Sequence, residues 1–316
     1  MGFESTKTAE HPFGPPYPKL VLQSSKSGWV GAGSEVFLGV GFSSFGFRSP
    51  WIEASGDSRH HSDSNPTEVV MSPLNEALEM AANIIRAGNV VALTGAGVST
   101  ESGIPDFRSK GGLWERFDPY DYAHIASFRQ NPERVWKMLA ELRETLTGKQ
   151  PNGAHTALAR MEASGLLKGV ITQNIDGLHQ AGGSRRVVEF HGNGQTLSCL
   201  ECRESVPREA VSDQMPPRCG QCGAILKPDV VFFGEEIPSQ AIWGSEELLD
   251  NADAVLVCGT SAEVYPASQI PQVVKMRGGK IIECNLSPAL NASIVDLRLL
   301  GKAGETLPAL ADLLGV

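Results

Sequence analysis

Hydrophobic residues from Asn89 onward fall into short continuous runs that alternate with segments of helical periodicity. The clearest runs are VVALT (90–94), GVITQN (169–174), AVLVCGTS (254–261) and KIIECN (280–285), and each passes directly into glycine or polar residues. Near-continuous Val, Ile and Leu strands that are joined by helices are typical of a parallel sheet covered on both faces. The pattern therefore predicts an α/β fold, and ligands bind sheets of this kind at the carboxyl ends of the strands.

The first segment with a clear helical pattern follows residue 71. Ser72 is a suitable N-cap, Pro73 suits the first helical position and Gly88 provides a stop. Between them, one apolar stripe is formed by Leu74, Ala77, Leu78, Ala81, Ile84 and Ile85. We therefore expect an ordered helix from Pro73 up to Gly88.

Residues 1–70 differ from the remainder of the chain. They are rich in Gly, Ser, Pro and Phe, show neither a helical nor an alternating period, and include the polar, linker-like run SGDSRHHSDSNP. Because Met71 opens the ordered part, we interpret residues 1–70 as a disordered or non-native N-terminal extension. A native, flexible tail is the alternative, and the intact mass of the protein from its natural source decides between them.

The composition of the chain limits the kinds of molecule that we expect it to bind. The 316-residue chain has a net charge of −9, a pI near 5.3 and 41% hydrophobic residues. No basic face is evident, so we expect no direct nucleic-acid binding, and an acidic chain suits cationic partners such as lysine-rich peptides. No apolar run reaches the roughly 18 residues of a membrane helix, and Glu4 and Glu10 stand where a secretory signal would carry basic residues. We therefore expect a cytoplasmic protein without a membrane partner.

Four of the six cysteines form two pairs, Cys199/Cys202 in CLEC and Cys219/Cys222 in CGQC, with residues 203–218 between the pairs. This spacing is typical of a zinc ribbon, in which four thiolates bind one structural Zn²⁺ and leave no open coordination position. Disulfides are the alternative, but paired CxxC units in a chain without a secretion signal favour a metal.

The run VVALTGAGVS predicts a strand, a glycine turn and the start of a helix. Gly95 and Gly97 would let the backbone approach a phosphate at the N-terminus of that helix, or would only make a tight turn. The following GIPDFRS segment places Asp106, Phe107 and Arg108 in a row after a proline. Arg108 could hold a phosphate or form a salt bridge with Asp106 that fixes the loop, and Phe107 could shield a reactive carbon from water.

Polar residues also follow two further strands. Gln173, Asn174 and Asp176 in TQNIDGLH suit the hydroxyl groups of a ribose, or else cap the helix that follows. His191 in VVEFHGN lies between a short strand and a glycine, and an imidazole that titrates near neutrality is the usual general base. Packing without a catalytic role is the alternative for His191. His179 is its nearest rival, but the pattern places His179 in a helix.

Taken together, these motifs resemble the sirtuins, the NAD-dependent protein lysine deacylases, of a bacterial or archaeal type. GAGVSTESGIPDFRS, TQNIDGLH, EFHGN, the paired CxxC units, PDVVFFGE and GTSAEVYPA occur in the order and spacing of that family. The resemblance covers the chain from about Met71 to its C-terminus, whereas residues 1–70 match nothing in it.

The resemblance implies a catalytic domain over 71–316 that has two parts. A small domain would hold the zinc over about 195–227 and would include a helical part over about 111–149. NAD and an acyl-lysine peptide would meet in the cleft between the two parts. The large, Rossmann-like part would comprise about 71–110, 150–190 and 228–316.

The resemblance also implies roles for individual residues. His191 and Asn174 would be catalytic, NAD and one structural Zn²⁺ per chain would be the cofactors, and acyl-lysine proteins or peptides would be the substrates. The residues expected to bind NAD are Gly95, Ala96, Gly97, Ser99, Asp106, Phe107, Arg108, Gln173, Asn174, Ile175, Asp176, Gly259, Thr260, Ser261, Asn285, Leu286 and Ala303. The residues expected to bind the peptide by β-strand addition are Val231, Phe232, Phe233 and Gly234.

The chemistry implied by the resemblance is acyl transfer from lysine to ADP-ribose rather than hydride transfer. The acyl oxygen would attack the ribose carbon as nicotinamide leaves, and His191 would act as a general base on a ribose hydroxyl, giving nicotinamide and O-acyl-ADP-ribose. Protein ADP-ribosylation at the same NAD site is the alternative. An incomplete GxGxxG motif argues against a nicotinamide oxidoreductase, and a zinc-ribbon binding module would release no nicotinamide.

Sirtuins that prefer succinyl or malonyl groups carry a Tyr and an Arg three residues apart on the helix after the cofactor loop. Leu139 and Leu142 align with those positions in this chain. An apolar floor cannot neutralise an acidic acyl group, so we expect acetyl-lysine, or a longer fatty acyl chain, to be preferred. A register error of one residue would place Arg143 there instead.

Overall fold

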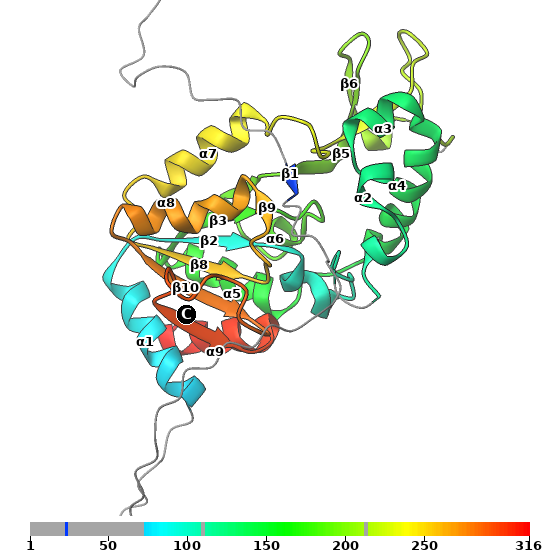
Figure 1. Ribbon diagram of the computed structural model, residues 1–316. Coiled ribbons are helices and arrows are strands. Elements are labelled where there is room, and N and C mark those ends of the chain that lie inside the picture. The colour runs from blue at the N-terminus through cyan, green and yellow to red at the C-terminus, as the bar shows by residue number, and fades with distance from the viewer. Residues whose placement is uncertain (1–22, 25–72, 109–110, 212–213) are drawn as a thin grey trace, which may run out of the picture. The chain divides into compact units, whose positions relative to one another are not determined.

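The computed structural model describes residues 23–24, 73–108, 111–211 and 214–316 (Figure 1). All of these residues belong to one compact unit of the chain. Apart from Gln23–Ser24, the segment interpreted as an N-terminal extension lies outside the described residues.

The centre of the structure is a parallel sheet of six strands in the order β11-β10-β8-β2-β3-β4. The strands are β2 (Val90–Thr94), β3 (Leu167–Thr172), β4 (Val187–Glu189), β8 (Ala254–Cys258), β10 (Lys280–Asn285) and β11 (Leu297–Leu300). The predicted Rossmann-like α/β sheet is therefore confirmed. The chain order reverses between β2 and β8, and sheets of this kind bind nucleotides at such a reversal.

Helices cover both faces of this sheet (Figure 1). α1 (Pro73–Ala87), α5 (Gly153–Ala163) and α9 (Ala303–Leu314) pack on one face through one apolar core. α7 (Ser239–Leu249) and α8 (Ile270–Met276) pack on the other face through a second core. Because both faces are covered, the strands can be apolar along their whole length, which explains the continuous runs in the sequence.

The predicted first helix, α1, begins at Pro73 and ends just before Gly88. Leu78, Ala81 and Ile85 of the predicted apolar stripe are buried against the sheet. The apolar residues that recur with the helical period in this segment therefore mark the face of the helix that packs on the core.

A smaller assembly lies beside the large sheet (Figure 1). It combines a helical part with an antiparallel sheet in the order β6-β5-β7. One apolar core that includes Trp136, Leu197 and Leu226 joins the two, and Trp136 Nε1 donates a hydrogen bond to the Leu226 carbonyl oxygen over 2.8 Å. The elements are α2 (Pro119–Tyr122), α3 (Ile125–Gln130), α4 (Pro132–Leu146), β5 (Gly192–Cys199), β6 (Ser205–Pro207) and β7 (Leu226–Val230).

Short elements complete the described part of the chain. β1 pairs with β9 in the antiparallel sense, with Gln23 opposite Tyr265 and Ser24 opposite Val264. No helix among the described residues is both long and apolar enough to cross a membrane. The short elements are β1 (Gln23–Ser24), α6 (Leu178–Ala181), β9 (Val264–Tyr265) and the 3-10 helices Ala96–Ser102, Leu113–Glu115, Arg208–Ala210 and Ala267–Gln269.

Candidate active site

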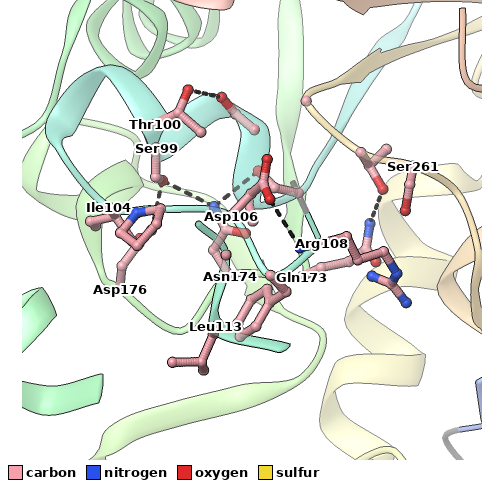
Figure 2. A pocket seen from close by; sticks show the side chains of 18 of the residues that line it. Ser99, Thr100, Ile104, Asp106, Arg108, Leu113, Gln173, Asn174, Asp176 and Ser261 are labelled. Atoms are coloured by element: carbon pink, nitrogen blue, oxygen red, sulfur yellow. Dashed lines mark hydrogen bonds between the residues drawn. The ribbon is translucent and has the colours of Figure 1, made fainter. Parts of the chain in front are cut away.

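A cavity of about 630 Å³ lies at the carboxyl ends of β2, β3, β8 and β10, beside the smaller assembly. Every residue expected to bind NAD lines this cavity, and so do His191, Val231, Phe232 and Phe233. Gly234 does not line it. Figure 2 shows side chains from several of these segments gathered around one space. Segments far apart in the sequence meet here because the carboxyl ends of parallel strands share one edge of the sheet.

Two glycine loops pack against each other where the chain order reverses. A Cβ on Gly97 would lie 2.7 Å from the Gly259 Cα, and a Cβ on Gly95 would lie 2.8 Å from the Thr260 Cβ. Real Cβ atoms do not come so close to other atoms, so both positions require glycine. Gly259 itself has a φ of +57°, a left-handed conformation that favours glycine.

The amides of both glycines are already used within this packing. The Gly97 amide donates to the Gly259 carbonyl oxygen over 2.8 Å, and the Gly95 amide donates to the Cys258 carbonyl oxygen over 3.1 Å. Neither amide is therefore free to bind a phosphate, whereas the Ala96 amide has no acceptor among the residues that the structure describes. The glycines hold two loops together and leave that one amide beside the cavity.

Ser99, Asn174 and Asp176 form one hydrogen-bonded cluster in the cavity wall (Figure 2). Asn174 Nδ2 donates to Ser99 Oγ and to the Gly95 carbonyl oxygen, both over 3.1 Å. Ser99 Oγ donates to Asp176 Oδ2 over 2.7 Å, and Asp176 Oδ1 accepts from the Leu178 amide at the start of α6 over 3.0 Å. The carboxylate thus caps the start of α6, as one of the two interpretations of this motif expects, and it also holds Ser99. Ribose binding by this motif stays a prediction.

A second hydrogen-bonded chain runs from Gln173 in the cavity wall to Glu283 in the core. Gln173 Nε2 donates to Thr260 Oγ1 over 2.9 Å, and Asn285 exchanges hydrogen bonds of 3.1 and 3.2 Å with the Thr260 backbone. The buried Glu283 accepts from Asn285 Nδ2 over 3.0 Å and from the Ala289 amide over 2.6 Å. Sequence reasoning missed Glu283, although a lone carboxylate within an apolar strand was a usable signal.

The loop after the first glycine turn is fixed by contacts that differ from the sequence hypothesis. Arg108 pairs through Nε with Glu263 Oε2 over 2.9 Å, rather than with Asp106. Asp106 Oδ1 accepts from the Arg108 amide over 3.0 Å (Figure 2). The ring of Phe107 lies against that of Trp114, with centroids 5.1 Å apart. The loop is therefore tied to the segment after β8 by Arg108 and closed by an aromatic pair.

The imidazole of His191 is buried and lines the cavity. Nδ1 lies 3.2 Å from the Gln173 carbonyl oxygen, which can only accept, so Nδ1 carries the proton. Nε2 is then an unprotonated acceptor, and it has no hydrogen-bond partner among the described residues. Burial lowers the pKa of His191 from 6.5 to about 4. The ring is therefore neutral at neutral pH and keeps a free base at Nε2.

Two further buried histidines lie next to the cluster of Ser99. The rings of His155 and His179 are 4.9 Å apart, and burial lowers the pKa of both, that of His179 to about 3. His155 Nε2 lies 3.5 Å from Ser99 Oγ, and His179 Nε2 lies 2.8 Å from Thr94 Oγ1. Sequence reasoning placed His179 in a helix, where it lies, but did not single out His155.

The four paired cysteines converge beside the small sheet. Their Sγ atoms all lie within 4.8 Å of one another, with 3.4 Å between Cys199 and Cys222 and 3.5 Å between Cys202 and Cys219. Tetrahedral Zn²⁺ with Zn–S distances of about 2.3 Å separates its sulfurs by about 3.8 Å. The donor set and its dimensions therefore fit zinc. The described cysteines form no disulfide.

Helix α4 forms a further part of the cavity wall, and the surface that it presents there is mostly apolar. Leu139 and Leu142 both line the cavity, together with Met138 and Leu146, whereas Arg143 does not. The structure thus agrees with the register that put leucines at these two positions. Among the described residues, the Lys and Arg side chains that line the cavity are each paired with a carboxylate, Arg108 with Glu263, Arg116 with Glu141 and Lys302 with Glu305.

The fold and the cavity define a class of protein, a Rossmann-like nucleotide-binding protein with a buried imidazole base and a four-cysteine metal cluster beside the sheet. A family model described as the Sir2 family matches residues 95–266, and the chain belongs to this family. NAD-dependent protein deacylase 1 of Archaeoglobus fulgidus is 46% identical over 70% of this chain and 91% of its own length. The NAD-dependent protein deacylase of Thermococcus kodakarensis is 44% identical over 72% of this chain and 91% of its own length.

Solved structures are similar over the same part of the chain. A crystal structure of a Sir2 homologue with NAD has 43% identity and a TM-score of 0.70, covering 75% of this chain and 93% of that one. A Sir2 structure with a deacetylated p53 peptide and 3'-O-acetyl ADP-ribose has 33% identity and a TM-score of 0.72, covering 76% of this chain and 99% of that one.

Proposed function

We propose that the chain is an NAD-dependent protein lysine deacylase that removes acetyl groups and releases nicotinamide and O-acyl-ADP-ribose. The observation that carries the proposal is the neutral imidazole of His191, which lines the cavity with an unpartnered Nε2. Membership of the Sir2 family supports it, since relatives are named NAD-dependent protein deacylases and one solved homologue holds NAD.

The cavity fits NAD in size and in the chemistry of its wall. Binding sites for ligands of this kind have volumes of roughly 300–1,000 Å³, and the free Ala96 amide lies between the two glycines that would cradle the pyrophosphate. Asn285 and Leu286 would hold the adenosine half, and Gln173 and Asp176 the nicotinamide ribose. When bound, NAD supplies an electrophilic ribose carbon from which nicotinamide can leave.

The protein's own groups supply the proton transfer and the positioning. Both hydrogens of Asn174 Nδ2 are used by Ser99 and Gly95, so Oδ1 is the atom left to accept a hydrogen bond from a ribose hydroxyl. His191 Nε2 would take a proton from a neighbouring ribose hydroxyl as that oxygen attacks the acyl carbon. Water would then complete the release of the free lysine amine and of O-acyl-ADP-ribose. A general base contributes about 10²- to 10⁴-fold, and Phe107 would keep water from the reacting carbon.

The peptide would bind by strand addition at the edge formed by Val231, Phe232 and Phe233. These residues line the cavity, and within the described part of the chain no group donates a hydrogen bond to the Val231 carbonyl oxygen. Val264 of β9 also lines the cavity, and β9 pairs with the extended residues of β1. The edge at β9 therefore accepts an extended main chain, and the edge at Val231 could accept one from the peptide.

The acyl group would rest on the apolar surface of α4. Leu139 and Leu142 offer no charge, and the cations in the wall are already paired, so a succinyl carboxylate would be buried without compensation. We therefore infer that acetyl and longer fatty acyl groups are preferred over succinyl.

Zinc would hold the small sheet together without touching the reaction. All four ligand positions are thiolates, which leaves no place for water or substrate on the metal. Because such thiolates must stay reduced, the cytoplasm is the compartment that we propose for the protein.

Nicotinamide release from NAD, measured with acetyl, decanoyl and succinyl peptides, tests the function and the acyl preference together. We expect release that requires an acyl peptide and is slower with succinyl than with acetyl. Mass spectrometry of the peptide identifies the reaction, because deacylation removes the acyl mass whereas ADP-ribosylation adds ADP-ribose. Release without any acyl peptide, or a gain of ADP-ribose, would contradict the proposal.

A further inference from the structure

One ion pair in the smaller assembly is buried next to the peptide edge. Lys227 on β7 and Glu235 lie 2.9 Å apart, and their side chains are only 8% and 21% exposed. The Lys227 ammonium also lies 4.4 Å from the centre of the Phe232 ring. Taking two charges out of water is costly, and a protein with apolar residues in their place is often more stable. Stabilisation of the fold is therefore a weak explanation for such a pair.

Both members of the pair bind the main chain of the edge itself. Lys227 Nζ donates to the carbonyl oxygens of Pro228 and Val230 over 3.0 and 2.7 Å. Glu235 Oε2 accepts from the Phe232 amide over 2.8 Å. The pair therefore holds the main chain on either side of Val231, the residue whose carbonyl oxygen is left for a peptide.

The same segment is bonded to the general base. The Val231 amide donates to the His191 carbonyl oxygen over 2.9 Å, and the Phe233 amide donates to the Ala123 carbonyl oxygen over 2.8 Å. A shift of the segment would therefore move the backbone of His191 as well as the strand edge.

From these contacts we infer that Lys227 and Glu235 form a positioning pair, which holds the strand edge for the acyl-lysine peptide and sets its place relative to His191. The inference rests on the proposed deacylase function. Neither side chain lines the cavity, so the pair acts through the main chain of residues 228–233 and not by touching the substrate.

The test compares Lys227→Met, Glu235→Gln and the double variant by steady-state kinetics. We expect kcat/KM for the acetyl peptide to fall about 10- to 100-fold in each single variant, as for a misplacement of about 1 Å. The Kd for NAD, measured by calorimetry, should change less than about twofold. If Lys227→Met fails to fold, Glu235→Gln still tests the inference, because the amide keeps the shape of the carboxylate and removes the negative charge that holds Lys227 Nζ.

The double variant separates positioning from stability. Removing both charges avoids an unpaired buried ion, so the midpoint of thermal unfolding should recover while kcat/KM for the peptide stays low. Recovery of both quantities would show that the pair has only a structural role. Lys275→Met is the matched control, since its pair with Asp296 at 2.7 Å is partly buried, with side chains 33% and 24% exposed, but lies away from the cavity. Inactive wild-type protein would instead refute the proposed function.

Discussion

At the scale of single residues, burial decides what the side chains of the site can do. Two histidines that the sequence offers as candidate bases, His179 and His191, are both buried and both have lowered pKa values. They differ in their surroundings, because His191 lines the cavity with a free Nε2 whereas His179 is bonded through Nε2 to Thr94 and does not line it. Only His191 can therefore take a proton from a bound molecule.

His191→Ala should abolish most of the deacylation and leave NAD binding intact. The substitution removes the general base, so we expect turnover to fall by about 10²- to 10⁴-fold. Turnover is measured with the acetyl peptide, and NAD binding by calorimetry. Asn193→Ala is the control, because Asn193 is a neighbouring polar residue that does not line the cavity. Turnover near the wild-type rate would remove His191 from the role.

The pH dependence of kcat/KM should reflect the lowered pKa of His191. The imidazole acts as a base only when it is neutral, and burial moves its pKa from 6.5 to about 4. Activity should therefore persist as the pH falls below 6.5 and be lost only as it approaches the lowered pKa. A titration of kcat/KM at constant ionic strength checks this, and an acidic limb centred near 6.5 would mean that the imidazole is hydrated in the working enzyme.

At the scale of elements, the site depends on loops that touch and on a small sheet held by a metal. The loops after β2 and β8 approach so closely that only glycine fits at their contact. The small sheet carries the cysteines at one end and the peptide edge just beyond the other end of β7. Each of these elements can be disturbed separately.

Gly97→Ala should weaken NAD binding through the loop contact. Its Cβ would lie 2.7 Å from the Gly259 Cα and 2.8 Å from the Gly259 carbonyl oxygen, so one loop must move. Overpacking of this kind costs about 1–3 kcal/mol, which corresponds to a rise in Kd of about 5- to 140-fold if it falls on the bound state. Gly194→Ala is the matched control, since a Cβ there would meet nothing within 4 Å. Equal NAD affinities for the two variants would contradict this prediction.

Removal of zinc should unfold the small sheet and its core. Cys199 and Cys219 belong to the same apolar core as Trp136, so loss of the metal should expose that indole and shift its fluorescence. Cys202→Ala is expected to bind no zinc and to lose activity, whereas Cys258→Ala, in the core of the large sheet, should retain one ion per chain. Metal analysis of both variants tests whether each still binds zinc. Full activity of zinc-free protein would refute the structural role of the metal.

At the scale of the whole molecule, strand order determines where the site lies. The order β11-β10-β8-β2-β3-β4 places the ends of β2 and β8 side by side, although their residues are more than 150 positions apart. The smaller assembly then closes the cavity with α4 and the peptide edge. The reaction proposed here therefore needs the described residues from Pro73 onward.

A chain that begins at Met71 should fold and retain full turnover. Among the described residues, it keeps all those that line the cavity and loses only Gln23 and Ser24 of β1. We expect an unchanged kcat, an unchanged NAD affinity and a midpoint of thermal unfolding close to that of the full chain. A truncated chain that fails to fold would show that residues before Met71 belong to the domain.

Much of the fold could be predicted from the sequence because the signals were local. The apolar runs indicate strands that are buried on both faces. The CxxC pairs indicate a metal site, whose tetrahedral geometry is set by the metal and its four thiolates. The partner of Arg108 could not be predicted in this way, because Glu263 is 155 positions away and only the packing of two loops brings it near. The same holds for His155 and Glu283, whose partners come from other segments: Ser99 and His179 lie next to His155, and Arg298 binds Glu283.

The sequence by itself determined the class of fold, the four cysteines, and which residues would stand at strand ends, since each follows from composition or spacing along the chain. Only the folded structure shows that the glycine amides are already bonded, that His191 is neutral with a free Nε2, and that Lys227 and Glu235 bind the main chain on either side of Val231. The physical reason is that hydrogen bonding, burial and pKa are properties of a side chain's surroundings, and those surroundings come from distant segments.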